Sequence, residues 1–153
     1  MDTTTLLAAI KDARQCGVCQ LAVYNKPADA PWASIVAQHF NAPTALTDEL
    51  IALSISQAYA ILTQLLAKDM AYEAELLPLE EARKLASAFL GLFSNQSIFF
   101  SNSSWSTEEA AALASGFEPK LRGWSPFTEA TFDSGIIVCD SDKIGIAWFE
   151  DED

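Results

Sequence analysis

Basic residues are scarce in this chain of 153 residues. Lys and Arg together number 9 against 21 Asp and Glu, so the formal net charge is −12. A protein this negative repels the phosphate backbone, which argues against direct binding of nucleic acid. Glycine occurs only six times, and neither phosphate-binding pattern, G-x-x-x-x-G-K-[ST] or G-x-G-x-x-G, is present. The composition therefore argues against a nucleic-acid-binding protein and against the common nucleotide-binding enzymes.

Histidine occurs once and cysteine three times. The odd cysteine count is typical of a reducing compartment rather than of a disulfide framework. Cys16 and Cys19 have C-x-x-C spacing but follow a predicted helix, whereas a redox site of this kind opens one. With His39 and Cys139 they would form a chemically sensible Cys₃His zinc set, although the spacing matches no known pattern. We expect free thiols, no metal, no cofactor and, without a nucleophile paired to His39, no enzyme.

Long apolar runs are also missing. The longest largely apolar stretch, residues 50–70, is interrupted by polar side chains and is too polar to span a bilayer. The N-terminus has no basic leader followed by an apolar core, so no secretory signal is expected. The prediction is a cytoplasmic protein that makes no membrane contact.

Apolar residues make up half of the chain and charged residues one fifth. A chain of this size and composition can bury a core without disulfides or metal. We predict one α+β domain spanning 1–153, in which N-terminal helices pack on a C-terminal antiparallel β-meander or hairpin. Residues 1–116 should be mainly helical, residues 117–150 rich in strand, and residues 151–153 an acidic tail.

Capping residues and apolar spacing locate the predicted helices. They are expected over 3–14, from Pro31 to about 40, over 48–70 behind a Thr47 cap, from Pro78 onward, and over 106–116 behind the capping box at Ser106 and Glu109. Residues 18–24 fit either a short strand or a continuation of the first helix.

Short apolar runs near the C-terminus predict strands. Residues 98–100 form one, and the alternation over 127–132 is typical of an edge strand. Residues 136–139 and 144–149 read as a hairpin joined by the polar residues 140–143. Because adjacent strand residues face opposite ways, one of Trp148 and Phe149 should be more exposed than the other.

Negative charge is concentrated at the C-terminus, where residues 129–153 hold eight acidic residues and one basic residue. Two interpretations remain open: a solubilising segment without a partner, or a docking surface for a basic protein. The docking surface would comprise Asp133, Asp140, Asp142, Trp148, Glu150, Asp151, Glu152 and Asp153. Complementary charge accelerates association and suppresses wrong partners.

The segments 132–138 and 144–153, a glycine-bearing hairpin that ends in an acidic tail, resemble the immunity proteins of bacterial toxin systems. The resemblance covers about the last quarter of the chain and carries no residue roles with it. It implies a single-domain inhibitor of a contact-dependent or type VI delivered toxin domain, often a basic nuclease. Two alternatives remain: an adaptor or regulatory domain with another partner, and a ligand-binding or enzymatic domain with a pocket near Trp32, Tyr59 and Trp105.

Overall fold

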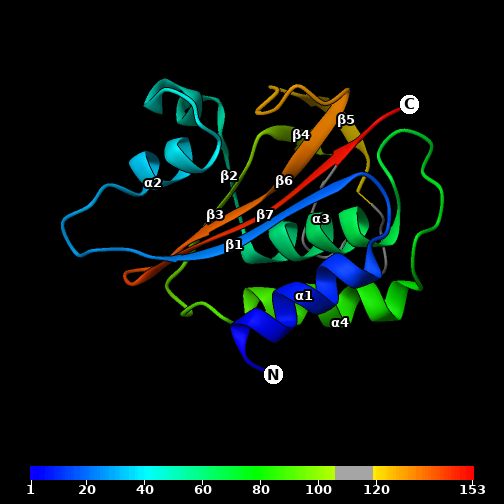
Figure 1. Cartoon of the computed structure of the whole chain (residues 1–153), viewed down its shortest axis with the longest axis horizontal. Helices are drawn as coiled ribbons and strands as arrows, with labels where there is room; N and C mark the ends of the chain where they lie inside the picture. The colour runs from blue at the N-terminus through cyan, green and yellow to red at the C-terminus, as the bar shows by residue number, and fades with distance from the viewer. Residues whose placement is uncertain (106–118) are drawn as a thin grey trace.

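A five-stranded antiparallel sheet organises the computed structural model, which describes residues 1–105 and 119–153 (Figure 1). The strand order is β1-β7-β6-β3-β2. The strands are β1 Val18–Asn25, β2 Ile51–Leu53, β3 Ile98–Ser101, β6 Phe132–Cys139 and β7 Lys143–Asp151. The predicted hairpin is confirmed as β6 and β7, which lie at the centre of the sheet. Residues 18–25 form a strand and occupy one edge, against β7.

A second, two-stranded sheet pairs β4 Ser103–Trp105 with β5 Leu121–Trp124. Each of these strands lies next in the chain to a strand of the main sheet, β4 after β3 and β5 before β6. The two segments were not predicted as strands, because two of the three residues of β4 are serine and β5 contains a glycine, which is depleted in strands.

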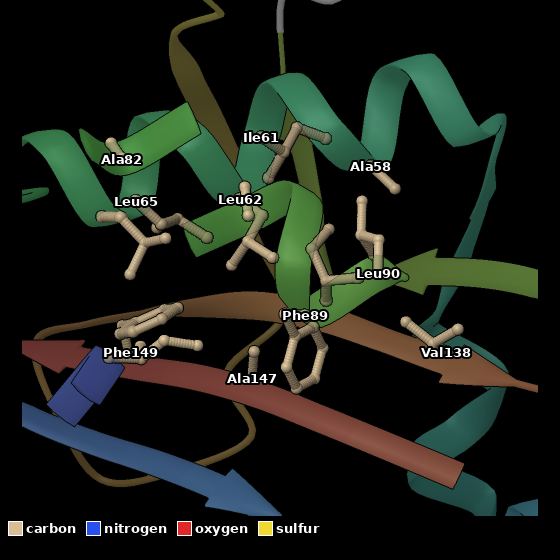
Figure 2. Close-up of a cluster of buried hydrophobic side chains, with 14 of the residues drawn as sticks. Ala58, Ile61, Leu62, Leu65, Ala82, Phe89, Leu90, Val138, Ala147 and Phe149 are labelled. Atoms are coloured by element: carbon tan, nitrogen blue, oxygen red, sulfur yellow. The ribbon is translucent and has the colours of Figure 1, made fainter. Parts of the chain in front are cut away.

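Helices cover both faces of the main sheet (Figure 1). On one face lie α1 Thr3–Ala13, α3 Ile55–Ala67 and α4 Leu79–Leu90, and on the other lie α2 Trp32–His39 and the 3₁₀ helix η1 Thr44–Glu49. Figure 2 shows α3 and α4 side chains, among them Leu62 and Phe89, packing over Ala147 and Val138 of the sheet. The predicted α+β class with N-terminal helices is confirmed.

Trp148 and Phe149 are both fully buried, so the expectation that one of them would be more exposed than the other is wrong. The alternation itself holds, because Phe149 joins the cluster under α3 and α4 whereas Trp148 joins the cluster under α2. Strands covered on both faces read as continuous apolar runs. The second helical layer, contributed by α2, is what the sequence did not reveal.

The helix predicted over 48–70 is shorter than expected. Residues 44–49 form η1, residues 51–53 form β2, and α3 begins only at Ile55. Ser54 and Gln57 close a reciprocal capping box, in which each backbone N–H donates to the other side chain, at 2.8 and 3.1 Å. Residues 51–53 pair with β3 as strand β2, so they do not belong to α3.

The edge strand predicted over 127–132 is also wrong, because residues 127–131 form a bent loop and β6 begins at Phe132. The Asp133 carboxylate holds this loop by accepting hydrogen bonds from the backbone N–H groups of Phe127 and Thr128. The helix predicted over 106–116 lies outside the described residues. Helices predicted from residue 3, from Pro31 and from Pro78 are confirmed.

Candidate functional site

The eight residues predicted to bind a partner separate into an inner and an outer set. Asp133, Trp148 and Asp151 are fully buried. The prediction that these three belong to an exposed surface is therefore wrong. Both strands of the hairpin lie at the centre of the sheet, so a carboxylate on either strand can be inside the protein rather than on its rim. Asp140 and Glu150 are half-buried, and Asp142, Glu152 and Asp153 are exposed.

Asp133 is the acceptor at the centre of a buried polar cluster. Its carboxylate accepts from the Trp148 indole N–H at 3.2 Å and from the Asn102 amide at 3.1 Å. It also accepts from the backbone N–H groups of Phe127 and Thr128 and from the Thr128 hydroxyl, at 3.0 to 3.2 Å. A buried carboxylate without a cation is tolerable only when such donors surround it. Asp133 is therefore a structural anchor.

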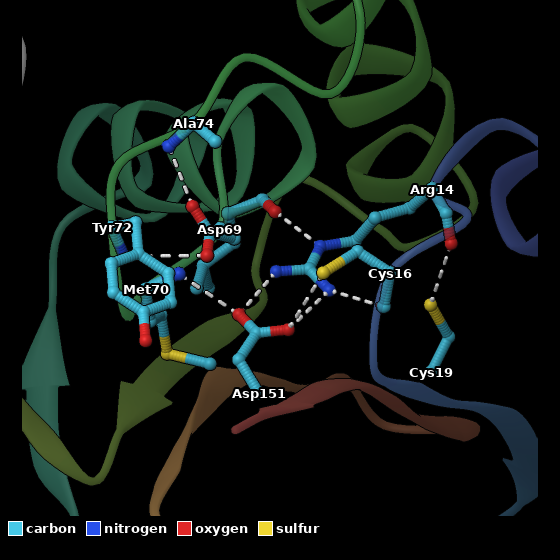
Figure 3. Close-up of polar contacts among 9 residues, drawn as sticks. Arg14, Cys16, Cys19, Asp69, Met70, Tyr72, Ala74 and Asp151 are labelled. Carbon is cyan, nitrogen blue, oxygen red and sulfur yellow. Dashed lines mark hydrogen bonds and ion pairs between the residues drawn. The ribbon is translucent and has the colours of Figure 1, made fainter. Parts of the chain in front are cut away.

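Asp151 forms a buried ion pair with Arg14 (Figure 3). The guanidinium donates to the two carboxylate oxygens at 3.0 and 2.7 Å, and both side chains are fully buried. Arg14 also donates to the carbonyls of Leu65 and Cys16, at 2.6 and 2.9 Å, and stacks over the Phe149 ring at 4.8 Å. The pair joins the end of α1 to the end of β7, and the bond from Arg14 to the Leu65 carbonyl links both to α3.

The same carboxylate reaches the loop that follows α3. The Met70 backbone N–H donates to Asp151 at 2.9 Å, and the adjacent Asp69 accepts from the N–H groups of Tyr72 and Ala74 (Figure 3). The Cys16 thiol lies 3.8 Å from Asp151. Burial raises the pKa of the Cys16 thiol, and the negative charge of Asp151 raises it further. This C-x-x-C segment is therefore not poised for thiolate chemistry.

Gly17 is required where the chain turns from α1 into β1. Its φ of 61° lies in the left-handed region, and a Cβ there would overlap the backbone carbonyl of Glu150. The glycine of the C-x-x-C segment therefore serves close packing of β1 against β7.

The outer carboxylates lie at opposite ends of the hairpin. Asp140 and Asp142 are at the β6–β7 turn, and Glu150, Glu152 and Asp153 are at the far end of β7. The strand between Asp142 and Glu150 spans about 26 Å. Asp140 is committed to the turn, where it accepts from the backbone N–H groups of Ser94, Asp142 and Lys143. Partial burial raises the pKa of Asp140, but the three hydrogen bonds together outweigh it and hold this pKa below its usual value. We call Glu150, Glu152 and Asp153 the acidic end.

A chain of side-chain hydrogen bonds extends from the acidic end across β1. Glu150 accepts from the Gln20 amide N–H₂ at 2.9 Å, which aims the Gln20 amide oxygen at His39 Nε2, 2.8 Å away. His39 Nδ1 and the Tyr24 hydroxyl are 2.6 Å apart. Because Gln20 presents its oxygen, His39 carries its proton on Nε2 and accepts from Tyr24 at Nδ1. Burial lowers the pKa of His39, which favours this neutral form.

The His39 partners were missed by sequence reasoning, which placed this residue on a helix without a companion. The only sequence pattern that points to them is the spacing of Gln20 and Tyr24, which lie on one face of a strand four residues apart. That pattern becomes informative only once 18–25 is known to be a strand rather than a continuation of α1.

The Cys₃His zinc set is not assembled. Cys16 precedes β1 and Cys19 lies within it, both bonded to Arg14. Cys139 is buried in the cluster under α2, and His39 is bonded to Gln20 and Tyr24. Burial raises the pKa of Cys139 to about 12. Within the described ranges, no group of three or more His, Cys, Asp or Glu side chains is placed to hold a metal ion.

The aromatic pocket of the enzymatic alternative is also not assembled. Trp32 of α2 stacks on Phe100 of β3, whereas Tyr59 lines a hollow of about 560 Å³ between α3 and α4. Trp105 belongs to the second sheet and does not line that hollow. Ile55, Leu90, Phe93 and Phe99 give the hollow its apolar walls, and none of its described lining residues is Asp, Glu, His, Lys, Arg or Cys. It therefore offers no acid–base pair.

Comparisons with known proteins add no relative. No protein-family model, curated protein or solved structure matches the chain. Among the residues that the structure describes, no helix has the length and apolar character needed to cross a membrane.

Proposed function

We propose that this protein is an immunity protein that binds and neutralises a basic bacterial toxin domain through its acidic end. The observation that supports the proposal is the division of the C-terminal carboxylates. Asp133 and Asp151 are satisfied inside the protein, whereas Glu150, Glu152 and Asp153 form no ion pair with any described Lys or Arg. The outward negative charge is therefore available to a positively charged macromolecule.

The physics of such a complex favours an acidic inhibitor. A nuclease toxin needs Lys and Arg to hold phosphates, and an acidic protein can occupy the same basic surface. Attraction between the two surfaces raises the rate of encounter, and a producing cell requires inhibition before the toxin acts. Glu150 and Glu152 are also held in place, by Gln20 and by Thr131 respectively, which reduces the entropy lost on binding.

The proposed surface is smaller than the eight-residue set expected from the sequence. Asp142 lies at the other end of the hairpin, about 26 Å away, so one compact partner domain need not touch both ends. Asp151 is excluded from any charge-reversal test because reversing it would place two cations together in the core.

The proposal is tested with a triple variant in which Glu150, Glu152 and Asp153 are replaced by Lys. The matched control replaces Asp12, Glu75 and Glu81, three exposed acidic residues elsewhere, and so makes the same change in net charge. Both proteins and the wild type are used to capture partners from the native host, and the captured protein is identified, purified and expressed alone.

The expected partner is a basic protein whose expression arrests growth and whose toxicity is relieved by co-expression of the wild type. The acidic-end variant should associate with it about tenfold more slowly and fail to protect, whereas the control variant should protect. A partner that is harmless when expressed alone would contradict the immunity function. Equal protection by the two variants would contradict the assignment of the acidic end.

A further inference from the structure

β1 is an edge strand without the usual protection against pairing. Its sequence, VCQLAVYN, contains neither a charged residue nor proline over eight positions, and its register with β7 runs without interruption. Natural edge strands are normally short, charged, bulged or covered. Figure 1 shows β1 running alongside β7, and β1 is the last strand on that side of the main sheet.

The register identifies which backbone groups of β1 point outward. The Lys26 N–H donates to the Asp142 carbonyl at 2.7 Å, and these two residues are the next pair beyond Asn25 and Lys143. Hydrogen-bonded and non-hydrogen-bonded pairs alternate along an antiparallel ladder. The backbone N–H and C=O groups of Cys19, Leu21, Val23 and Asn25 therefore point away from β7. No hydrogen bond from these backbone N–H groups to another described segment is present.

We propose that β1 pairs antiparallel with β1 of a second copy of this chain, through a two-fold axis that passes beside Ala22. This register uses every outward group, because Cys19 then faces Asn25 of the second copy and Leu21 faces Val23. The two main sheets become one continuous sheet. Leu21 and Val23, which are only partly buried in a single copy, gain a cross-strand neighbour.

The charges that flank β1 are complementary in the same register. Lys26 of one copy faces Val18 of the other, and the neighbour of Val18 on β7 is Glu150. The Lys26 ammonium donates to the carbonyl of Pro27 at 3.4 Å and forms no ion pair with a described carboxylate, so its side chain is able to turn toward Glu150 of the other copy. Val18, which is 52% exposed, would be covered by the aliphatic stem of Lys26.

The net charge of −12 on each copy opposes association through long-range repulsion. Salt screens that repulsion, whereas backbone hydrogen bonds in the joined ladder are much less sensitive to it. We therefore expect the dimer to tighten as salt rises from low to moderate concentration. The inference concerns self-association and does not depend on the identity of a toxin partner.

A cysteine cross-link tests the register. In the proposed dimer Ala22 faces Ala22 of the second copy in a non-hydrogen-bonded pair, with Cα atoms about 4.5 Å apart, which is within the range for a disulfide. The A22C variant should form a covalent dimer under mild oxidation. The Q20C variant is the matched control because residue 20 would face Tyr24 rather than itself. Cys16, Cys19 and Cys139 are retained in both variants and in the wild type.

A charge test separates specific pairing from a change in net charge. The V18K variant would place a second ammonium group opposite Lys26 of the other copy and weaken the dimer about tenfold, although it makes each chain less negative. The Y72K variant makes the same net charge change at a side chain that is 70% exposed and lies outside β1. It should leave the dimer as tight as in the wild type or slightly tighter. Sedimentation equilibrium measures each dissociation constant.

A monomeric wild type at high protein concentration and moderate salt would overturn the proposal. Equal cross-linking of A22C and Q20C would overturn the register, as would V18K and Y72K dimers of equal affinity. Should V18K prove poorly folded by circular dichroism, V23P provides a second test. It removes an outward N–H without removing a bond to β7, and it should also abolish the dimer.

Discussion

Arg14 and Asp151 lie 137 positions apart in the chain, yet their side chains meet in two parallel hydrogen bonds with neither exposed to solvent. The pair connects the first helix to the last strand. It also positions the loop after α3 through Met70. The acidic C-terminus is therefore partly a structural element of the core, and only its outer carboxylates are available for recognition.

Replacing Asp151 with Asn should strongly destabilise the fold. The change leaves the Arg14 guanidinium buried without its counter-ion, and loss of one member of a buried pair typically costs about 3–5 kcal/mol in free energy of unfolding. Urea denaturation measures this difference. The neighbouring exposed residue provides the control, because Glu152→Gln should change stability by less than about 1 kcal/mol. Similar effects of the two variants would contradict the buried pair.

Replacing Asp133 with Asn should release the 127–131 loop. An amide has one acceptor oxygen where the carboxylate has two, and its N–H₂ group would face the donors of Phe127 and Thr128. The expected loss is about 2–3 kcal/mol in free energy of unfolding. Thermal unfolding followed by tryptophan fluorescence measures it, and Glu129→Gln in the exposed part of the loop is the control. An Asp133→Asn protein as stable as the control would show that the carboxylate is dispensable.

His39 should make stability depend on pH near neutrality. Burial lowers its pKa in the folded state, so the unfolded chain binds the proton first as the pH falls. The stabilisation is fully present above the unfolded pKa of about 6.5 and is lost as the pH falls below it, levelling off beneath the folded pKa.

Urea denaturation of the wild type and of His39→Gln, at about pH 7.5 and about pH 5.5, measures that dependence. The wild type should lose more stability over this interval than the variant does. Carboxylates that titrate in the same range contribute equally to both proteins and cancel in the comparison. Identical pH dependence in the two proteins would show that His39 does not titrate differently on folding.

Cys139 should be the last thiol to react in the native protein. Its pKa of about 12 leaves almost no thiolate at neutral or mildly alkaline pH, and its side chain is buried under α2. Labelling with a disulfide reagent, followed by mass mapping at timed intervals, should find Cys16 and Cys19 modified first. In urea all three thiols should react at similar rates. Early labelling of Cys139 in the native protein would contradict its burial.

Local sequence patterns predicted the elements that need no distant partner. The helices from residue 3, from Pro31 and from Pro78 depend on caps and apolar spacing, and the β6–β7 hairpin depends on a short polar turn between two apolar runs. The failures involve residues whose role is set by a distant segment. Residues 51–53 pair with β3 rather than extend α3. Residues 127–131 bend around the Asp133 carboxylate rather than form a strand.

Composition and local spacing alone determined the α+β class, the excess of negative charge and its concentration toward the C-terminus. Which of those carboxylates face solvent was decided only by tertiary structure. The burial of a charge depends on whether a cation or several N–H donors reach it, and Arg14 reaches Asp151 across almost the whole length of the chain. The unprotected edge at β1 was likewise decided by tertiary structure. The sequence of a strand does not determine whether a second strand pairs with each of its sides, because that depends on the strand order of the sheet.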